Sequence, residues 1–574
     1  MSSCQAAYCS MGVFSRCLML KRASITVIII VSSAFFSWAV AAESPVTTMV
    51  ARHLKERIEN SSVNELKYCR QKFLGASSIV PPFYEERDFR PAWIEETGIS
   101  FQAEDLIRVI RAAYLEGLYP GDYHTATVEE LIRNMKEGVS PHDDPELLAD
   151  IDMLLTNAFL MYASHISSGL IDSDTMCRRK MIDHRHTDVV RHLHVALVAK
   201  SVESTLESLR PPHRVYHGLR AALKQYRDIE SRGEWPAMPP GLKMRSGTID
   251  DRVRLLRRHL IVTGDLPSQH SIDSDLFDDN LRRAVRRYQR RHGLTVDGVV
   301  GPDTVACINV PVSEWIRKIV VNLERLRWIP REAAWSSIMI NIADFQLDAV
   351  EDERSVFTMK VVVGSNYRKT PLFSGMMSYL VINPYWYIPT KLVEKDIYPM
   401  IKKKRNFLTV QKIRVFKHWG WDAPEIDPAT VDWSRLERGT FYYKLRQDPG
   451  PQNSLGRIKF VFPNKYAVYL HDTPHKELFA MNSRGFSAGC IRIEKPIELA
   501  AYVLREYEEW TPAAIRNVIV SGERRVIHLP RKIPVNLLYR TAWTDFDDVV
   551  HFRHDIYERD DSLYSVLCGE SLDW

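Results

Sequence analysis

Cysteine is scarce in this sequence, and its spacing is irregular. The 574 residues contain 8 cysteines, three of which (4, 9 and 17) lie at the extreme N-terminus. The remainder are widely separated, and are Cys69, Cys177, Cys307, Cys490 and Cys568. Because their number is odd and no CxxC pair occurs, the sequence favours neither a disulfide framework nor a zinc site.

A strong excess of either charge is also missing. The formal net charge is +5, with 26% charged and 45% hydrophobic residues. These proportions are ordinary for globular domains and argue against long disorder. A charge this small gives no reason to expect a nucleic-acid partner. At about 100–200 residues per domain, the length predicts three or four domains.

Long apolar runs are absent except for one near the N-terminus. Residues 23–42 are uncharged, follow Arg16, Lys21 and Arg22, and end in Ala39-Val40-Ala41. This order is typical of an export signal, and the length would also span a bilayer. We therefore interpret residues 1–42 as a signal peptide or signal anchor. We expect an exported, periplasmic protein that meets the membrane only through this segment, with inner-membrane anchoring left open.

Residues 43–247 read as a mainly helical scaffold domain. In the stretch 146–170, apolar residues such as Leu147, Ile151 and Leu155 recur at helical spacing. Residues 234–247 are rich in proline and glycine and indicate a domain boundary. The region contains no cluster of residues typical of catalysis.

Residues 248–312 predict a small three-helix domain. Leu281, Ala284, Val285 and Tyr288 share one face of a helix, and six arginines (282, 283, 286, 287, 290 and 291) cover the rest. We interpret these arginines as a solvated face, because an exported protein rarely meets nucleic acid. The run from Tyr288 through "HGLTVDGVVGPDT" resembles peptidoglycan-binding-type domains, with Tyr288 in place of phenylalanine. Asp297, Gly298, Gly301 and Thr304 match that pattern, and we interpret most of them as turn-formers.

After a linker helix expected at 313–334, apolar residues recur at every second position, the spacing typical of strands. Alternating apolar residues at 338–342 and 359–363, and short strands expected at 379–383, 457–462, 466–471 and 517–522, predict a β-rich domain over 335–535. Residues 391–450 interrupt it with basic and aromatic residues. Long ordered insertions of this kind are typical of functional lids. Residues 536–574 are a C-terminal extension expected to pack on the scaffold or catalytic domain.

Cys490 and His471 are the residues most suited to chemistry. Attack on a carbonyl needs a thiolate, and an imidazole can take the thiol proton and return it to the leaving amine. Asp472 could orient His471 through its side chain or its backbone carbonyl. The N–H groups of Gly489 and Cys490 could bind an oxyanion.

Each of these features also has an ordinary structural explanation. An unpaired cysteine before an apolar run is often a core residue. His471 and His475 are four residues apart, but they flank a Thr-Pro turn and no HExxH motif or third ligand is present, so we predict no metal site and no cofactor. Spacing alone leaves nucleophile and buried thiol as alternatives.

The segment "HDTP…GFSAGCIRI" resembles the active-site signature of YkuD-type L,D-transpeptidases, a histidine followed by Ser-x-Gly-Cys-x-Arg. Residues 361–389 and 446–464, the helical segment "FYEERDFRPAWIEETG" and the stretch 535–560 are similar to the large YcbB-like subgroup. The resemblance therefore covers essentially the whole chain after the leader. Many smaller members carry a second histidine before Gly-Cys, where this chain has Ala488, so His471 is the one base that the motif leaves nearby.

The resemblance implies a multidomain α+β protein and a peptidoglycan L,D-transpeptidase. Cys490 would attack the diaminopimelate–D-Ala bond of a tetrapeptide stem, and an acceptor amine would resolve the thioester into a 3→3 cross-link. Such an enzyme would be a carbapenem target, and its partners would be donor and acceptor stems, with other wall-synthesis enzymes an open expectation. The residues expected to contact substrate or support the site are Ser487, Arg492, Tyr385, Trp386 and Asn453; Ser487 and Arg492 could instead brace the loop, and the aromatics could simply pack. A cysteine carboxypeptidase or endopeptidase and a non-catalytic wall-binding scaffold remain alternatives.

Overall fold

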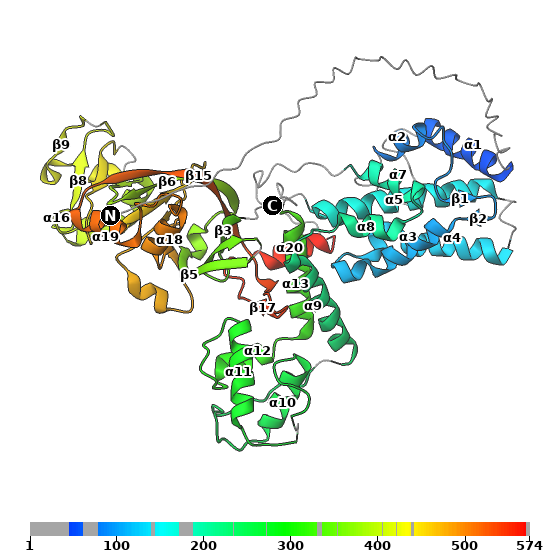
Figure 1. The fold of residues 1–574 in the computed structure, drawn as a ribbon, viewed down its shortest axis with the longest axis horizontal. Coiled ribbons are helices and arrows are strands. Elements are labelled where there is room, and N and C mark those ends of the chain that lie inside the picture. Colours follow the sequence, from blue (N-terminus) through cyan, green and yellow to red (C-terminus); the bar gives the residue numbers. More distant parts are fainter. Residues whose placement is uncertain are drawn as a thin grey trace, which may run out of the picture. The chain divides into compact units, whose positions relative to one another are not determined.

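The structure is a computed structural model that describes residues 45–60, 78–138, 144–171, 188–233, 235–270, 273–329, 336–352, 354–404, 406–420, 422–437 and 441–569. The predicted export segment at 1–42 lies outside these residues, as do Cys69 and Cys177. From Val46 onward the described residues belong to one compact unit. Helices dominate the first half and strands the second, which confirms the predicted multidomain α+β class (Figure 1).

The N-terminal helices share one apolar core. They are α1 (Pro45–Asn60), α2 (Val80–Glu85), α3 (Phe101–Arg111), α4 (Thr125–Gly138), α5 (Pro145–Ser168), α7 (Val189–Val198) and α8 (Val202–Leu209). Helix α5 is buried without a break over 148–160. By length and composition α5 could cross a membrane, but 83% of its apolar window is buried inside the protein, as expected for a core helix.

Three short helices form the next core: α10 (Arg252–Val262), α11 (Asp279–Arg291) and α12 (Pro302–Ile308). The turn after α11 is held by Gln289, whose side-chain amide donates to Asp297 Oδ1 at 2.8 Å and whose Oε1 accepts from Gly298 N at 2.8 Å. Gly298 has φ +75°, a left-handed conformation that favours glycine. Asp297 and Gly298 are therefore turn-formers, as the sequence predicted.

One of the six helix arginines does not lie on a solvated face. Arg291 is 4% exposed, and its guanidinium donates to both carboxylate oxygens of Asp265, at 2.9 Å and 2.5 Å. The prediction of a uniformly solvated basic face is wrong at this position. Helical periodicity places Arg291 beside Tyr288 and Gln289 but cannot reveal a partner 26 residues away.

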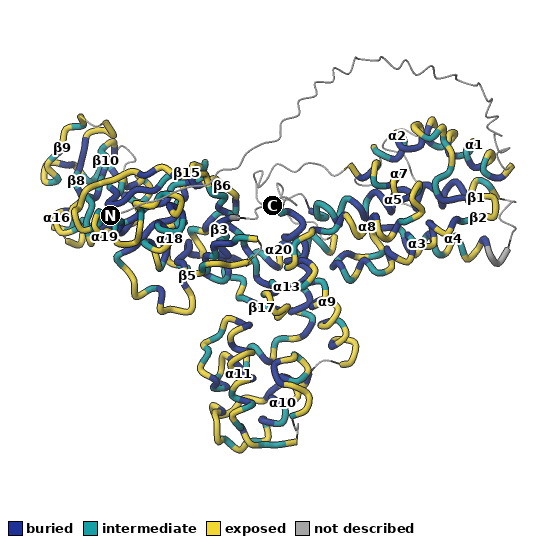
Figure 2. The backbone as a smooth tube through the Cα atoms, in the orientation of Figure 1, coloured by how far each residue is buried: buried dark blue, intermediate teal, exposed yellow. Residues whose placement is uncertain are grey.

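The catalytic domain is built on nine strands, in the order β13-β5-β14-β12-β11-β6-β15-β3-β4. Their bounds are β3 (Ser336–Asn341), β4 (Gln346–Glu351), β5 (Arg354–Gly364), β6 (Phe373–Ile382), β11 (Ile458–Val461), β12 (Leu470–His471), β13 (Gly485–Ser487), β14 (Ile491–Ile493) and β15 (Arg525–Leu538). Because β4 also pairs with β5, the sheet closes on itself. Its inward residues form the second large core, together with helices α18 (Pro496–Val503) and α19 (Pro512–Ser521). Figure 2 marks the buried segments of the backbone in dark blue.

Two predicted strands differ in the structure. Residues 517–521 belong to helix α19 rather than to a strand, because Thr511 caps the helix by accepting from Ala514 N, Pro512 starts it, and Gly522 ends it at φ +73°. Of the strand expected over 466–471, only β12 at Leu470–His471 is a strand. Capping residues on either side of an apolar run outweigh its β propensity here.

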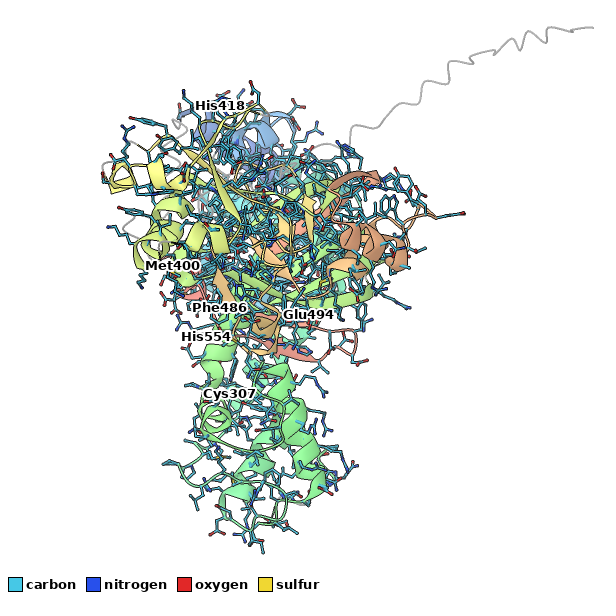
Figure 3. All side chains as sticks on the ribbon, turned by 90° about the vertical axis from the view of Figure 1, so that its left-hand side faces the viewer. Cys307, Met400, His418, Phe486, Glu494 and His554 are labelled. Carbon is cyan, nitrogen blue, oxygen red and sulfur yellow. The ribbon has the colours of Figure 1, made fainter. Side chains whose placement is uncertain are left out.

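The insertion after β6 has its own sheet and core. Its strands are β7 (Trp386–Ile388), β8 (Ile413–Phe416), β9 (Glu425–Ile426) and β10 (Lys444–Gln447), in the order β7-β10-β8-β9. Ile388, Val415 and Leu445 are among its buried core residues. Met400 and His418, labelled in Figure 3, lie in this insertion. A bidentate ion pair joins its Asp396 to Arg368, at 2.6 Å and 2.8 Å.

The C-terminal extension packs on two elements that precede the catalytic domain. Its strands β16 (Ala542–Thr544) and β17 (Val550–Phe552) share a core with α9 (Arg214–Ser231) and α13 (Val312–Arg327). Helix α20 (Asp560–Leu567) is held to α13 by an ion pair between Asp560 and Arg325 at 2.7 Å. Tyr557, between these elements, belongs to the core of the catalytic domain.

We predict that Asp265→Ala destabilises the three-helix domain by about 3 kcal/mol, because it leaves the buried Arg291 guanidinium without its counter-ion. Asp279→Ala is the matched control, since Asp279 pairs with Arg282 in an exposed position and its loss costs less than about 1 kcal/mol. Calorimetric unfolding of the full chain measures both. Equal effects of the two variants would contradict the structural role given to Asp265.

Candidate active site

Three neighbouring strands set the frame of the site. Lys459 of β11 pairs with His471 of β12, and His471 pairs in turn with Arg492 of β14. Residues directly opposite one another in a sheet point to the same face, and neighbours along a strand point to the other. The alternate residues Phe460, Leu470 and Ile491 are fully buried in the core. The side chains of Lys459, His471 and Arg492 therefore form one row on the outer face.

Cys490 immediately precedes β14 and lies on this same face, two residues before Arg492. The next residue, Ile491, donates its N–H to the Tyr469 carbonyl at 3.2 Å, which places Cys490 beside Tyr469. The thiol is partly exposed. The thiol donates a weak hydrogen bond to the Ala467 carbonyl at 3.8 Å, and the side chain of Tyr469 neighbours those of Cys490 and Trp386. Thus the structure brings Cys490 and His471 to one face of adjacent parallel strands.

The His471 imidazole is fixed by the backbone of the next residue. Its Nδ1–H donates to the Asp472 carbonyl oxygen at 2.5 Å, which leaves Nε2 as the acceptor of the neutral ring. The Asp472 carboxylate is used elsewhere, accepting from Arg457 N at 2.7 Å and from Lys476 Nζ at 2.5 Å. Of the two ways in which Asp472 could orient His471, the structure has the one through its backbone.

Burial and neighbouring cations keep the imidazole neutral. Burial, followed by the Arg492 guanidinium, lowers the pKa of His471 to about 3, although the Asp472 carbonyl opposes this. Burial also raises the pKa of the Cys490 thiol, against the lowering effect of the Tyr469 backbone N–H and of Lys459. The free site therefore holds a neutral thiol and a neutral base. Among the described residues, no hydrogen bond joins the two side chains directly.

The loop before Cys490 is braced by Ser487. The Ser487 hydroxyl donates to the Cys490 carbonyl at 2.5 Å and accepts from Gly489 N at 3.1 Å. The Gly489 N–H is therefore already engaged, which does not fit its predicted role as an oxyanion donor. The Cys490 N–H has no acceptor among the described residues and is the donor left free. Gly489 has φ +116°, a backbone conformation that residues with a side chain rarely adopt.

Hydrogen bonds from Thr370 and Tyr557 also support the loop before Cys490. The Thr370 hydroxyl donates to the Gly489 carbonyl at 3.0 Å and accepts from Gly364 N at 2.9 Å. The Tyr557 hydroxyl donates to the Gly364 carbonyl at 2.7 Å and accepts from Thr370 N at 3.1 Å. The C-terminal extension thus holds the loop that carries Cys490 in place. The sequence carries no local signal for this contact, because its partners are nearly 200 residues apart.

The other predicted contact residues differ in how available they are. Asn453 is 1% exposed, and its amide donates to the carbonyls of Pro384 (3.1 Å) and Asp448 (3.0 Å) and accepts from Leu455 N (2.8 Å). Asn453 therefore braces the segment that returns from the insertion rather than pointing at substrate. Trp386 is half-buried beside Tyr469, and Tyr385 lies against the Arg446 guanidinium at 4.6 Å.

Lys459 and Tyr469 were missed by the sequence reasoning, although a signal for both exists. Lys459 stands in the alternating stretch "RIKFVF", with Ile458 and Phe460 buried on either side. Tyr469 precedes His471 by two residues and therefore shares its face. The Lys459 ammonium lies over the Tyr469 ring, 3.8 Å from its centroid. The exposed Phe486, labelled in Figure 3, flanks the same loop.

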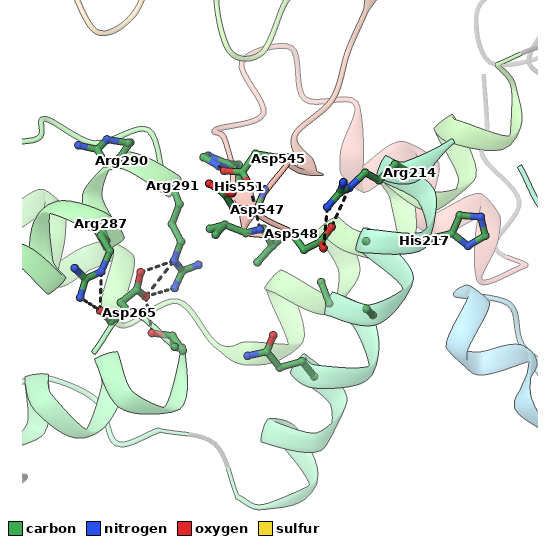
Figure 4. A pocket seen from close by; sticks show the side chains of 18 residues that line it. Arg214, His217, Asp265, Arg287, Arg290, Arg291, Asp545, Asp547, Asp548 and His551 are labelled. Carbon is green, nitrogen blue, oxygen red and sulfur yellow. Dashed lines mark hydrogen bonds and ion pairs between the residues drawn. The ribbon is translucent and has the colours of Figure 1, made fainter. Parts of the chain in front are cut away.

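The part of the chain that the structure describes places no metal cluster at these residues. Among the described residues, no group of three or more His, Cys, Asp or Glu side chains is placed to hold a metal ion, and His475 pairs with Glu477 at 3.1 Å. A cavity of about 930 Å³ is instead lined by α9, α11 and the C-terminal hairpin. Figure 4 shows its mixed charge, with Arg291 on Asp265 and Arg214 on Asp548. None of the predicted site residues lines it.

Comparison with known families matches three parts of the chain. Residues 78–223 match the "Scaffold domain", residues 250–308 the "Putative peptidoglycan binding domain", and residues 336–523 the "L,D-transpeptidase catalytic domain" of the YkuD family. The site residues Lys459, Tyr469, His471, Cys490 and Arg492 all fall within the last match.

Relatives agree with this assignment. A Haemophilus influenzae protein named "Putative L,D-transpeptidase" is 34% identical over 248 residues, which is 43% of this chain and 49% of that protein. The chain thus spans about half the length of this curated relative.

Two solved structures of L,D-transpeptidases are similar to part of the chain. The one from Xylanimonas cellulosilytica is 16% identical, with a TM-score of 0.16, over 52% of this chain and 99% of that one. The one from Stackebrandtia nassauensis is 12% identical, with a TM-score of 0.19, over 53% of this chain and 96% of that one. At these TM-scores the two likenesses carry no argument. Residues 336–523 are, by their family match, an L,D-transpeptidase catalytic domain of the YkuD type, which this chain joins to a scaffold domain and a peptidoglycan-binding-type domain.

Proposed function

We propose that the protein is a peptidoglycan L,D-transpeptidase that uses Cys490 as its nucleophile. The observation that carries the proposal is the placement of a partly exposed thiol and a buried neutral imidazole on one face of adjacent strands, within the matched domain. A neutral thiol next to a neutral base suits an attack in which the proton moves as the bond forms.

The reaction divides into two acyl transfers. Cys490 Sγ attacks the carbonyl of diaminopimelate in a tetrapeptide stem while His471 Nε2 takes the thiol proton. The C–N bond then breaks, and the same proton passes to the amine of the departing D-Ala. A side-chain amine of a second stem attacks the thioester and loses a proton to His471. The C–S bond then breaks, and His471 returns the proton to the departing thiolate, which leaves the free thiol and a 3→3 cross-link. Rotation of the Cys490 side chain or a bridging water closes the distance to the imidazole, since catalytic hydrogen bonds often form only with substrate bound.

The oxyanion of each tetrahedral intermediate has one backbone donor at hand. The Cys490 N–H is free, whereas the Gly489 N–H is held by Ser487. Fixed donors of this kind stabilise developing charge without reorganising during the reaction. The braces from Ser487 and Thr370 serve to keep this N–H in position.

The folded insertion acts as a lid. Trp386 at its base lies beside Tyr469, and Asp396 is tied to Arg368 in the loop that carries Thr370. A lid so attached would exclude water from the thioester and favour an amine acceptor over hydrolysis. The scaffold and peptidoglycan-binding-type domains would orient the wall polymer rather than react with it.

Location and partners follow from this chemistry. An enzyme acting on stem peptides works outside the cytoplasm, which agrees with the export signal expected at 1–42. Its partners would be donor and acceptor stems, and carbapenem-like agents would acylate Cys490. Hydrolysis of the same thioester would make the protein a carboxypeptidase instead, and the products distinguish the two.

Treatment with a carbapenem-like acylating agent tests the nucleophile. We expect intact-protein mass spectrometry to show one adduct on the wild type and none on Cys490→Ala. Cys568→Ala is the control, because Cys568 is an exposed free thiol outside the site and its loss should leave the adduct unchanged. Cross-linked dimers from tetrapeptide stems would identify a transpeptidase, and free tripeptide a carboxypeptidase. A wild type that is not acylated would overturn the assignment.

The pH dependence of Cys490 alkylation tests the neutral pair. Because the pKa of the thiol is raised above its ordinary value of 9.0, the thiolate fraction keeps growing with pH, and the alkylation rate should rise without a plateau through pH 9. Site-resolved mass spectrometry after timed exposure to iodoacetamide measures this. A plateau near pH 6–7 would instead indicate a preformed thiolate–imidazolium pair.

The lid's attachment gives a prediction about product choice. Asp396→Asn removes the charge that pairs with Arg368, and we expect hydrolysis to rise against transfer by up to about fivefold, the range of a partly exposed ion pair. The ratio of tripeptide to cross-linked product measures it. Glu425→Gln, which removes an exposed partner of Arg414 within the lid, is the control. An unchanged ratio in Asp396→Asn would show that the ion pair does not help the lid to exclude water.

A further inference from the structure

Two cations stand beside the nucleophile without a counter-ion. Lys459 and Arg492 are both half-buried, and within the described residues no carboxylate lies at ion-pairing distance from either. The Nε of Arg492 is buried and has no hydrogen-bond partner among these residues. Charged side chains that leave water are normally paired, because their desolvation is otherwise uncompensated.

The acids closest in sequence are already used. Asp472 accepts from Lys476 and from a backbone N–H, and Glu477 pairs with His475. Lys459 has instead the face of the Tyr469 ring, 3.8 Å from its ammonium. Burial lowers the pKa of both Lys459 and Arg492, against the opposing effect of the neighbouring Cys490 and, for Arg492, of Glu477. The protein therefore keeps both cations on the open side of the sheet without an ion-pair partner among the described residues, and the exposed Glu477 acts on Arg492 only from beyond ion-pairing distance.

Their geometry makes them a pair. Lys459, His471 and Arg492 occupy one row across β11, β12 and β14, so the imidazole lies between the two cations. Adjacent strands are about 4.8 Å apart, which puts the Cα atoms of Lys459 and Arg492 about 10 Å apart. Two long, flexible side chains at that separation can both reach one anionic group placed over the imidazole.

We propose that Lys459 and Arg492 together bind a carboxylate of the acyl-donor stem and so select donors that carry it. This inference rests on the proposed function, since the donor is the stem that Cys490 attacks. A carboxylate accepts hydrogen bonds from both an ammonium and a guanidinium, and such charge-assisted bonds are the strong ones. Lys459 and Arg492 thereby act as specificity-determining residues for the same site.

Two carboxylates of the donor have the required chemistry. One is the terminal carboxylate of the departing D-Ala, next to the bond that breaks. The other is the side-chain carboxylate of diaminopimelate, on the acyl side. Recognition of the first would restrict the enzyme to stems that end at D-Ala, whereas the second would select the residue at the acyl position. Synthetic donors in which either group is amidated separate the two.

A competing role for the cations is to stabilise the thiolate of Cys490. Both are among the neighbours that lower the pKa of this thiol. That role would affect attack on every donor equally, because the thiol is the same whichever donor is bound. Carboxylate recognition affects only donors that carry the recognised group.

The experiment measures kcat/KM for release of the leaving residue from three tetrapeptides: the parent, its C-terminal carboxamide, and the form amidated on the diaminopimelate side chain. The proteins are wild type, Lys459→Met, Lys459→Arg and the control Lys532→Met, which removes an exposed lysine of β15. We expect Lys459→Met to lower kcat/KM on the parent peptide about tenfold relative to wild type. On the peptide that lacks the recognised carboxylate, Lys459→Met and wild type should have the same kcat/KM. Lys459→Arg should restore kcat/KM on the parent peptide. Lys532→Met should match wild type throughout.

Other outcomes decide against the proposal. Equal loss by Lys459→Met on all three peptides would assign Lys459 to the thiolate and overturn carboxylate binding. If wild type releases nothing from any peptide, the proposed function fails by itself. Titration calorimetry of the three peptides into Cys490→Ala then still tests the pair, because equal affinities for all three would overturn it and weaker binding of one amide would support it.

Discussion

The register between β11, β12 and β14 is the constraint on which the site depends. It puts Phe460, Leu470 and Ile491 into the core and, by the same alternation, turns Lys459, His471 and Arg492 outward. A shift of one residue in β12 would turn the imidazole toward the core beneath the sheet and bring Leu470 to the face that carries Cys490. Strand β12 is only two residues long. Its position is therefore fixed by its neighbours β11 and β14 and by the buried side chains of the core beneath it. Closure through β4 and β5 leaves β11, β12 and β14 paired on both sides, away from any edge of the sheet.

Alternation of apolar and polar residues in the sequence predicts most of these strands, but not all of the fold. Alternation predicts β3, β5 and β11 because their apolar residues face one core. It fails at 517–522, where Thr511, Pro512 and Gly522 specify a helix at both ends of a β-prone run. It also cannot distinguish Arg291, whose buried partner Asp265 lies in another turn of the domain. Local patterns determine elements, whereas pairings between distant residues require the fold.

The same division applies to the site. Cys490 and His471 stand out from the sequence because their chemistry is rare and their motif is compact. Lys459 and Tyr469 carry no such mark, and only the strand register makes them neighbours of the thiol. Gly489 shows the reverse: its type is explained by φ +116°, a backbone requirement, and its N–H is engaged with Ser487. Tyr557, which supports the loop from the C-terminal extension, could not have been associated with it from spacing at all.

Burial and neighbouring charge act in opposite directions on the pKa of the Cys490 thiol, and the effect of burial is the larger in the free protein. It raises the pKa of Cys490 and lowers that of His471, so the ion pair that would make the thiol reactive is not formed in advance. Unused cations beside a neutral pair leave the site electropositive, and an anionic group brought by a substrate would change that balance most where the two cations converge. A carboxylate over His471 would favour the imidazolium that forms during attack, since it would compensate the two charges that disfavour it. The site would then become competent for proton transfer only when a donor with the right charge is in place, which couples recognition to reaction through electrostatics alone.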